Sequence, residues 1–360
     1  MSYTTVNKGL VHMNTLTYSG NGLGTASRTG VGFQPDMVWF KARSGSLSGE
    51  NHHLYDSVRG VGKFLIPNEA PAEGTDTNGL KDFDPDGFTT GDKTDINGGS
   101  TEYVAWNWKG NGTATSNTDG SVTSTVSANT TSGFSIVKYT GSSSGITVGH
   151  GLGSGNVPKM IIVKKLTAID AWQVYHHTLG TNKKMTLNDV SSAVTDTVIW
   201  QNTTPDDSVF YLGARGEVNA ASQDYIAYCF AEVRGFSKFG NYKPVGPADG
   251  NFLYTGFKPS FVMIKNTDNG NRNWTILDSK RTNFGSIAHG KSNFNVLNAR
   301  INPNNASAEA YGNTCDFYSN GIKLRTAEGD FNTGDGVNYI YMAFAEAPLV
   351  GTNNVPCTAR

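Results

Sequence analysis

Three aspartates in one short segment have the residue types and the spacing of a cation site. Asp82, Asp84 and Asp86 occupy alternate positions and a glycine follows them, as in the first half of an EF-hand calcium loop. The last ligand position of such a loop falls on Lys93, which is not a cation ligand, and no helical pattern flanks the segment. Two interpretations therefore stay open: a calcium site, or a hydrated turn that leads into a strand at Phe88.

The histidines lack the spacing of a metal site. None of them forms an HExxH or HxH pattern, so we expect them in exposed loops or hydrogen-bonded at the ends of strands. The set comprises His12, His52, His53, His150, His176, His177 and His289.

A hydrolytic site would need a carboxylate beside a histidine and a serine. The residues considered for it are Asp56, His176 and Asp278. They occupy the same position in three copies of a repeat, which is described below. The sequence therefore predicts that they lie apart, one in each copy, and that the protein is not an enzyme.

Glycine-rich and aromatic segments offer two further binding chemistries. Residues 149–155 are rich in glycine but lack the Gly-Lys-Ser/Thr ending of a phosphate-binding loop, which argues against a nucleotide site. Exposed aromatic rings together with asparagines would suit a carbohydrate ligand, and the candidates are Trp172, Trp200, Trp274 and Tyr311. Packing in a hydrophobic core is the alternative role of such rings.

The elements that carry these residues repeat three times along the chain. A motif that starts with proline and ends with lysine at the seventh position occurs at residues 35–41, 158–164 and 259–265. The residues between are mostly β-branched, aromatic or methionine, and each run is too short for a helix. We therefore expect a buried strand at each motif.

Each copy closes with an aromatic strand that begins at Tyr103, Tyr225 or Tyr339, which follows the proline by 68, 67 and 80 residues. Side chains alternate between the two faces of a strand. In the middle copy residues 225, 227, 229 and 231 would face one side, and residues 226, 228 and 230 the other. Both sets are largely apolar, which predicts a strand covered on both sides, by its own sandwich core or by a neighbouring unit.

A Tyr-Ser/Thr-Gly step precedes each proline motif, at residues 18–20, 139–141 and 254–256. On this alignment the first two copies insert residues 21–34 and 142–157 before the proline, and the third copy lacks such an insertion. We expect the insertions to form surface loops or hairpins that carry binding. The first two units would then bind, while the third would serve assembly.

The step Asp-Ser-x-Arg occurs at residues 56–59 and 278–281, and the middle copy has lost it, with His176 in place of the aspartate. We expect these Asp–Arg pairs to be local salt bridges or turn caps, each worth about 0.2–1 kcal/mol if exposed.

Composition places the boundaries of three units. Residues 116–132 are almost wholly Gly, Ser, Thr and Asn, which is typical of a flexible or edge-strand linker and predicts separable flanking units. Unit 1 would span residues 1–115, unit 2 residues 133–248, and unit 3, with a C-terminal tail, residues 249–360. Residues 236–244 carry three aromatic side chains, so we expect them to pack against a unit or a partner.

Composition and charge also exclude classes of function. The 43 glycines favour short strands and many turns. The 29 Lys and Arg balance 30 Asp and Glu, so no net field attracts nucleic acid, and no apolar run has the length of a membrane span or a signal peptide. Cys229, Cys315 and Cys357 lack CxxC spacing, so we expect buried or inert thiols and synthesis in a reducing cytoplasm.

Several of these motifs resemble a family of bacteriophage structural proteins that is frequent in marine and cyanobacterial phages. The resemblance rests on the proline-to-lysine motif, the Asp-Ser-x-Arg step, the segments at residues 225–232 and 235–240, and the chain end at 344–360. It covers nearly the whole chain, from about Val11, and Cys357 departs from it because a β-former is expected there. Members are called tail-fibre-like or virion structural proteins. The resemblance implies a virion location and carries over no catalytic residue.

Together these observations predict an all-β protein of three tandem β-sandwich, jelly-roll-like units. We expect a non-enzymatic virion component, assembled in the host cytoplasm and associated with the tail as a fibre, baseplate or receptor-facing protein. It would form a homo-oligomer, contact other virion proteins and bind a host-surface glycan or receptor. We expect no cofactor beyond the calcium alternative, no nucleic acid and no membrane insertion.

Two rival functions stay open. One is a capsid decoration or vertex appendage protein, which differs from a tail protein only in its partners. The other is a carbohydrate-active depolymerase, which would need two carboxylates about 5–10 Å apart in a groove.

Overall fold

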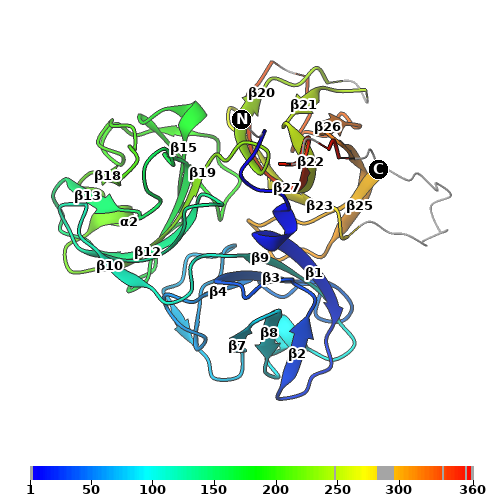
Figure 1. Ribbon diagram of the computed structural model, residues 1–360, viewed down its shortest axis with the longest axis horizontal. Helices are drawn as coiled ribbons and strands as arrows, with labels where there is room; N and C mark the ends of the chain where they lie inside the picture. Colours follow the sequence, from blue (N-terminus) through cyan, green and yellow to red (C-terminus); the bar gives the residue numbers. More distant parts are fainter. Residues whose placement is uncertain (1–2, 247–248, 282–295, 335, 353–354, 358–360) are drawn as a thin grey trace.

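The structure, a computed structural model, describes residues 3–246, 249–281, 296–334, 336–352 and 355–357. Its regular elements are antiparallel strands, with only single-turn helices between them, so the prediction of an all-β protein is confirmed. Figure 1 shows three lobes packed around a common centre, formed by residues 13–108, 115–231 and 237–348.

The first lobe is sandwich-like, because Val38, Phe40 and Ala105 of one sheet pack against Leu80 and Phe88 of another. Its main sheet has the order β1 (Met13–Ser19), β9 (Glu102–Trp108), β3 (Met37–Ser44), β4 (His53–Asp56). Its second sheet has the order β2 (Ala26–Thr29), β8 (Gly87–Thr90), β7 (Leu80–Asp84). The smaller elements are η1 (Gly9–Val11), β5 (Lys63–Phe64) paired with β6 (Gly74–Thr75), and α1 (Thr94–Asn97).

The second lobe repeats this plan with a wider main sheet. The order of that sheet is β10 (Thr115–Asn117), β11 (Ser124–Asn129), β12 (Phe134–Thr140), β19 (Asp224–Ala231), β14 (Pro158–Lys165), β15 (Gln173–His176), β16 (Lys183–Thr186), β17 (Val194–Thr195). The second sheet pairs β13 (Ile146–Gly149) with β18 (Val209–Leu212). The single-turn helices are η2 (His177–Leu179) and α2 (Gly216–Asn219).

The third lobe has two four-stranded sheets. The main sheet has the order β20 (Ser237–Tyr242), β27 (Tyr339–Pro348), β22 (Phe257–Asn266), β23 (Trp274–Asp278). The second sheet has the order β21 (Phe252–Tyr254), β26 (Gly321–Leu324), β25 (Ala310–Tyr318), β24 (Val296–Arg300).

The three main sheets share a strand order and a register. In each, the aromatic closing strand (β9, β19 or β27) lies between an opening strand and the strand of the proline motif. The residue two positions after the proline pairs with Asp56 in the first lobe, His176 in the second and Asp278 in the third. This correspondence supports the predicted repeat and places the three polar residues one in each lobe.

The opening strand of the third lobe is not the one that the Tyr-Ser/Thr-Gly step predicts. In the first two lobes the tyrosine of this step stacks on the first tyrosine of the closing strand, with ring centroids 5.4 and 5.3 Å apart. In the third lobe the ring that stacks on Tyr339, at 5.1 Å, is Tyr242, and Tyr254 lies on β21. The alignment of residues 254–256 with the other two steps is therefore wrong, and the third copy lacks no insertion.

Residues 236–244 pack as predicted, because they contain this opening strand. The rings of Phe236, Phe239 and Tyr242 are buried, and β20 pairs along its whole length with β27. A unit boundary between residues 248 and 249 thus falls after the first strand of the third lobe, not before it.

The segments predicted as binding loops contain strands of the second sheets. Residues 21–34 include β2, which pairs with β8, and residues 142–157 include β13, which pairs with β18. They are neither free loops nor independent hairpins, because each pairs with a strand distant in the sequence.

Residues 116–132 also belong to a sheet. Strand β11 pairs with β12 along its whole length, and Ser124, Val126 and Ser127 are buried while Thr125 is exposed. Residues 116 and 117 belong to the edge strand β10, and residues 124–129 form β11 between β10 and β12.

The closing strands are covered on both faces, as predicted. In β19 residues 225, 227, 229 and 231 join the core of the second lobe, whereas residues 226, 228 and 230 join a hydrophobic cluster that extends through all three lobes. In β9 Ala105 faces the core of its own lobe, and Val104, Trp106 and Trp108 face the shared cluster. The lobes are therefore not separable in the way that the linker composition predicts.

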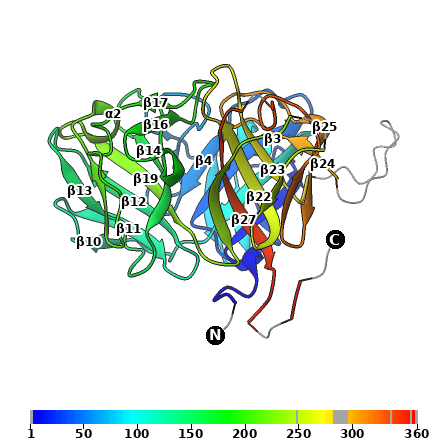
Figure 2. The same cartoon turned by 90° about the horizontal axis from the view of Figure 1, so that it is seen from above.

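Three aromatic rings meet where the lobes join. Trp108, Phe230 and Phe344 occupy the same register position in the three closing strands. Their ring centroids are 5.9, 6.0 and 6.4 Å apart in the three pairs. Figure 2 shows β22 and β27 running through the thickness of the molecule beside the first lobe.

Candidate functional site

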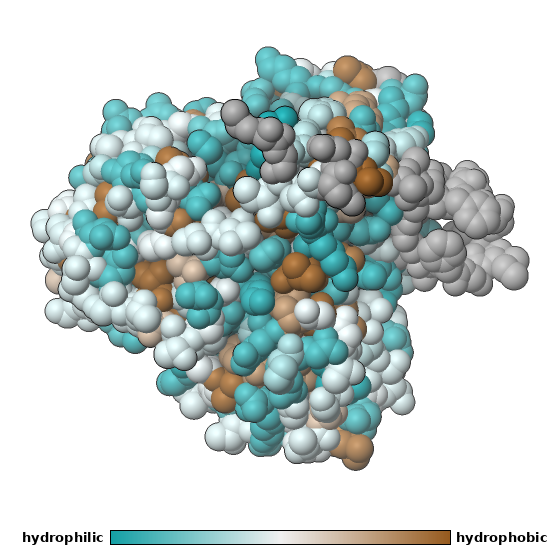
Figure 3. All heavy atoms as spheres, in the orientation of Figure 1, coloured by the Kyte–Doolittle hydropathy of each residue, from teal (hydrophilic) through white to brown (hydrophobic). Residues whose placement is uncertain are grey.

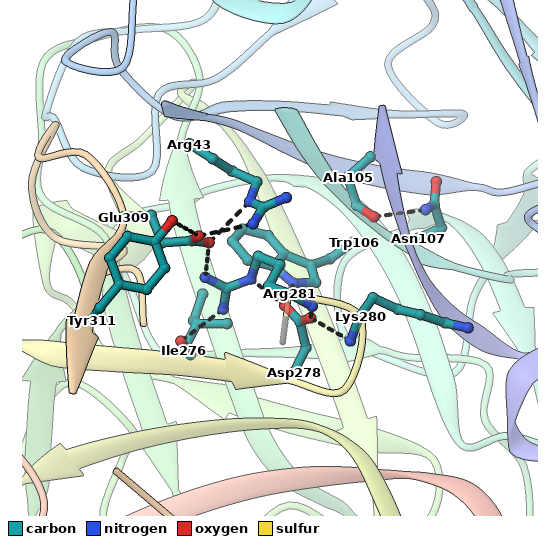
Figure 4. A network of polar contacts seen from close by, with 10 residues as sticks. All are labelled: Arg43, Ala105, Trp106, Asn107, Ile276, Asp278, Lys280, Arg281, Glu309 and Tyr311. Carbon is teal, nitrogen blue, oxygen red and sulfur yellow. Dashed lines mark hydrogen bonds and ion pairs between the residues drawn. The ribbon is translucent and has the colours of Figure 1, made fainter. Parts of the chain in front are cut away.

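The polar residues of the repeat meet the neighbouring lobe at three corresponding junctions. At the junction of the third and first lobes, Asp278 Oδ2 accepts a hydrogen bond from Trp106 Nε1 at 2.9 Å. The same oxygen lies 2.5 Å from Arg281 Nε, and both charged side chains are fully buried. Figure 4 shows the carboxylate held between these two donors.

This junction extends into a network of four charged groups. Glu309 lies 2.9 Å from Arg281 Nη1 and 2.8 Å from Nη2 of Arg43, which comes from the first lobe (Figure 4). Burial alone would raise the pKa of Glu309, but its hydrogen bond from Arg43 and the charge of Arg281 hold that pKa below its usual value. The network therefore carries two paired negative and two paired positive charges.

The junction of the first and second lobes repeats this arrangement. Asp56 Oδ2 accepts a hydrogen bond from the hydroxyl of Tyr228 at 2.7 Å and lies 2.6 Å from Arg59 Nε. Arg59 also lies 3.3 Å from Glu73. Burial, together with the Asp56 carboxylate, raises the pKa of Tyr228 well above its usual value, so the hydroxyl stays a proton donor.

The junction of the second and third lobes is built from neutral groups. His176 takes the place of the aspartate, and its Nε2 lies 3.3 Å from the backbone oxygen of Tyr341. The closing-strand residue that corresponds to Trp106 and Tyr228 is Met342, which has no donor to offer a carboxylate. Burial, with the adjacent His177, lowers the pKa of His176 to about 3, so its ring is neutral at pH 7. Both sides of this junction have therefore changed together.

A second set of contacts joins the lobes through the residues four positions before Asp278, His176 and Asp56, at or just before the start of the same strands. Trp274 Nε1 donates to the oxygen of Thr186, 2.9 Å away in the second lobe, and Trp172 Nε1 donates to Ile66 in the first lobe at 3.1 Å. His52 holds this position in the first lobe, and its Nε2 lies 3.2 Å from the oxygen of Asn302 in the third. Each lobe thus contacts its neighbour in the same sense around the centre.

These junctions use the residues that a hydrolase would need. Asp56 and Asp278 are held by arginine and an aromatic donor, and His176 is held by backbone and Thr178. None of the three is presented to solvent, since each is at most 1% exposed. Their chemistry is that of a buried contact between lobes, and the Asp–Arg pairs are the expected local salt bridges and turn caps, in buried positions.

The three aspartates of the calcium motif point to separate partners. Asp84 accepts a hydrogen bond from Thr89 at 2.7 Å, and Asp86 accepts from the backbone of Gly30 and Gly32 at 3.1 and 2.6 Å. Asp82 is exposed on β7. The segment forms the predicted turn between β7 and β8, and the part of the chain that the structure describes holds no group of three His, Cys, Asp or Glu placed to bind a metal.

Four histidines fit the expectation of hydrogen-bonded positions at the ends of strands, because they lie at or next to the ends of β4, β13 and β15. His52, His53, His150 and His176 are at most 2% exposed, and each has a hydrogen-bonding partner. His289 lies outside the described residues.

The aromatic residues proposed as a carbohydrate platform are mostly in the core. Trp172, Trp200 and Trp274 are at most 2% exposed, so all three have the alternative role of packing in a hydrophobic core. Tyr311 is 47% exposed, and its hydroxyl donates to Glu309 at 2.8 Å. Among the cysteines, Cys229 and Cys315 are buried free thiols as expected, and burial raises the pKa of both.

Three buried asparagines escaped the sequence analysis. Asn97, Asn219 and Asn332 each accept a hydrogen bond from the backbone of the loop after the opening strand, at 3.1, 2.8 and 3.3 Å. Each also donates to a backbone oxygen six residues earlier, at 2.7, 3.1 and 2.7 Å. They stand six, six and seven residues before the closing tyrosine, and this spacing is the signal that could have found them.

The lysine that ends each proline motif is also buried. Lys41, Lys164 and Lys265 are fully buried, and each ammonium group donates to backbone oxygens, such as that of Ser48 at 2.7 Å from Lys41. Burial lowers the pKa of each to about 8. These lysines act as internal hydrogen-bond donors, and the backbone oxygens that accept from them offset the cost of burying the ammonium groups.

Comparisons with known proteins add a family. Among the described residues, no helix has the length and apolarity needed to cross a membrane. Neither the curated proteins nor the solved structures include a match to the chain. One family model, described as "Domain of unknown function (DUF7483)", matches residues 8–348, and this range contains all three lobes and their junctions. The chain therefore belongs to the DUF7483 family.

Proposed function

We propose that the protein is a non-enzymatic structural component of a bacteriophage particle, associated with the tail. It would act through its surfaces, by contacts with other virion proteins or further copies of the chain and with the host surface. The resemblance of its motifs to phage structural proteins gives the proposal its biological setting, and the geometry of the junctions supports its physical part.

The observation that carries the proposal is the use of the buried polar groups. Asp56, Asp278 and His176 each hold one lobe against the next, and the buried arginines and Glu309 complete those contacts. Side chains that could transfer protons are thus committed to rigid assembly of the lobes. Such a body suits a particle component that must keep its shape while it presents outer surfaces.

The surface agrees with this role. On the face that Figure 3 presents, apolar residues form small patches separated by polar ones, and large exposed apolar side chains occur on all three lobes. Examples are Leu23, Ile169 and Tyr254, at 60, 78 and 56% exposed. Contacts with other particle proteins would draw on such patches.

The test is to locate the chain in whole particles. Antibodies raised against the purified protein would be applied to purified phage whose genome encodes it, with immunogold electron microscopy and mass spectrometry as readouts. We expect stoichiometric amounts in the particle and gold at the tail. Absence from purified particles would overturn the virion role, and gold on the shell alone would replace the tail assignment by capsid decoration.

A second measurement tests the absence of catalysis. The purified protein is incubated with capsular or cell-wall polysaccharide of the host, and the products are separated by size. We expect the polysaccharide to keep its length. Release of oligosaccharides that is lost in a heat-denatured sample would establish a depolymerase instead.

A further inference from the structure

The third lobe carries two exposed aromatic rings on the outer face of its second sheet. In β21 Phe252 and Tyr254 are 45 and 56% exposed, whereas Leu253 between them is 6% exposed and joins the core. The alternation of a strand thus directs both rings away from the core, on the same face. Figure 1 shows β21 and β26 in the upper lobe.

Neighbouring strands extend the aromatic surface. The ring centroids of Phe252 and Tyr318 on β25 are 6.2 Å apart at an angle of 62°. Gly321 on β26 pairs with Tyr254, and a Cβ there would lie 2.6 Å from Phe252 Cζ. The glycine thus lets the Phe252 ring lie across the strand.

Charged side chains border these rings in balanced pairs. Arg325 Nε lies 2.6 Å from Asp316, and an Arg325 Nη2–H donates to the hydroxyl of Tyr318 at 2.9 Å. Asp249, 78% exposed at its side chain, lies 3.0 Å from Lys323 Nζ and 3.2 Å from Arg325 Nη1. Two cations face two carboxylates, so the border has donors and acceptors without a net charge.

The corresponding faces of the other lobes lack this surface. By strand pairing, the positions of Phe252 and Tyr254 are held by Ser27 and Thr29 on β2, and by Thr147 and Gly149 on β13. The packing of the fold therefore does not require rings at these positions. The aromatic surface is a property of the third lobe alone among the described residues.

We propose that this face, formed by Phe252, Tyr254, Tyr318, Lys323 and Arg325, binds a neutral saccharide. Sugar rings present C–H faces that pack on aromatic rings, and their hydroxyls both donate to carboxylates and accept from guanidinium and ammonium groups. The balanced charges of the border disfavour anionic or cationic ligands. The saccharide would be the host-surface ligand of the receptor-facing role proposed above, and its biological meaning rests on that role.

The test uses substitutions that the other lobes already carry. The double variant Phe252→Ser with Tyr254→Thr places on β21 the side chains of β2, so it should fold like the wild type. Tyr211→Thr is the matched control, because Tyr211 stands on the corresponding face of the second lobe, at the position of Lys323. Circular dichroism and thermal melting verify that all three proteins are folded.

Binding is measured on a printed array of neutral hexose and N-acetylhexosamine oligosaccharides, with sialylated and sulfated oligosaccharides beside them. We expect the wild type and Tyr211→Thr to bind at least one neutral glycan, and the double variant to lose at least tenfold in signal. Equal binding by the folded double variant, preference for anionic glycans, or no binding at all would overturn the proposal. The array contains no phage particles, so a failure to bind glycans would not contradict a location in the particle. That location is tested separately by immunogold microscopy and mass spectrometry.

Size-exclusion chromatography with light scattering tests the competing use of the same face. We expect the oligomeric state to be the same in the wild type and the double variant. A dimer that the double variant abolishes would overturn the saccharide assignment in favour of a contact between two copies of the chain.

Discussion

A buried charge that loses its partner destabilises the fold, so single charged residues at the junctions should have large effects on stability. Asp278 and Arg281 are fully buried, so removal of one charge leaves the other without compensation. Burial of such pairs does not in itself add stability relative to apolar residues. Their effect is to fix which lobe faces which, because Met342 at the third junction could not satisfy an aspartate.

Asp278→Asn should therefore lower the free energy of unfolding by about 3–5 kcal/mol, as expected when one partner of a buried ion pair is neutralised. Urea unfolding followed by tryptophan fluorescence measures the change. The control is Asp82→Asn on an exposed strand position, which should change the free energy by less than about 0.5 kcal/mol. Equal effects of the two substitutions would contradict the importance of the junction.

The buried histidines predict a loss of stability in mild acid. The folded pKa of His176 is about 3, below the unfolded value of about 6.5, so the unfolded chain binds more protons between these values. Its contribution is present above pH 6.5 and is lost as the pH falls toward 3. The free energy of unfolding, measured at pH 7 and pH 4.5, should fall less in His176→Gln than in the wild type. An identical fall in both proteins would argue against a buried neutral His176.

At the scale of elements, the sequence predicted the strands with the strongest repeated signals. The proline motifs became β3, β14 and β22, and the split of residues 225–231 between two faces is the split between two hydrophobic cores. The opening strand of the third lobe was missed, because Tyr254 resembles Tyr18 in its neighbours and Tyr242 does not. The sequence around Tyr254 resembles an opening strand, but Tyr242 occupies that position in the fold. Only the pairing of Tyr242 with Tyr339 identifies the opening strand.

Tyr242 and Tyr254 should respond differently to substitution. Tyr242→Ala removes a buried ring that stacks on Tyr339 and donates to the oxygen of Phe331 at 2.6 Å, so we expect a loss of about 3–5 kcal/mol in the free energy of unfolding. Tyr254→Ala removes an exposed ring, and we expect a change within about 1 kcal/mol. Chemical denaturation measures the loss in both variants. A larger loss for Tyr254→Ala than for Tyr242→Ala would favour the alignment of residues 254–256 with the other two Tyr-Ser/Thr-Gly steps.

At the scale of the whole molecule, three lobes act as one body because their closing strands share a core. The sequence showed that both faces of these strands are apolar, but not what covers them. The alternation of side chains along a strand shows which residues share a face. Which element covers that face depends on contacts between residues far apart in the sequence, such as Trp106 with Asp278. The burial of Trp172 and Trp274 at the junctions is likewise decided by tertiary packing, which the sequence does not show.

The three lobes should unfold together, and differential scanning calorimetry of the full chain tests this most directly. A shared core predicts one transition, with calorimetric and van't Hoff enthalpies equal, and Trp108→Ala at the common centre should shift that transition as a whole to lower temperature. Separate transitions, of which Trp108→Ala moves only one, would contradict the account.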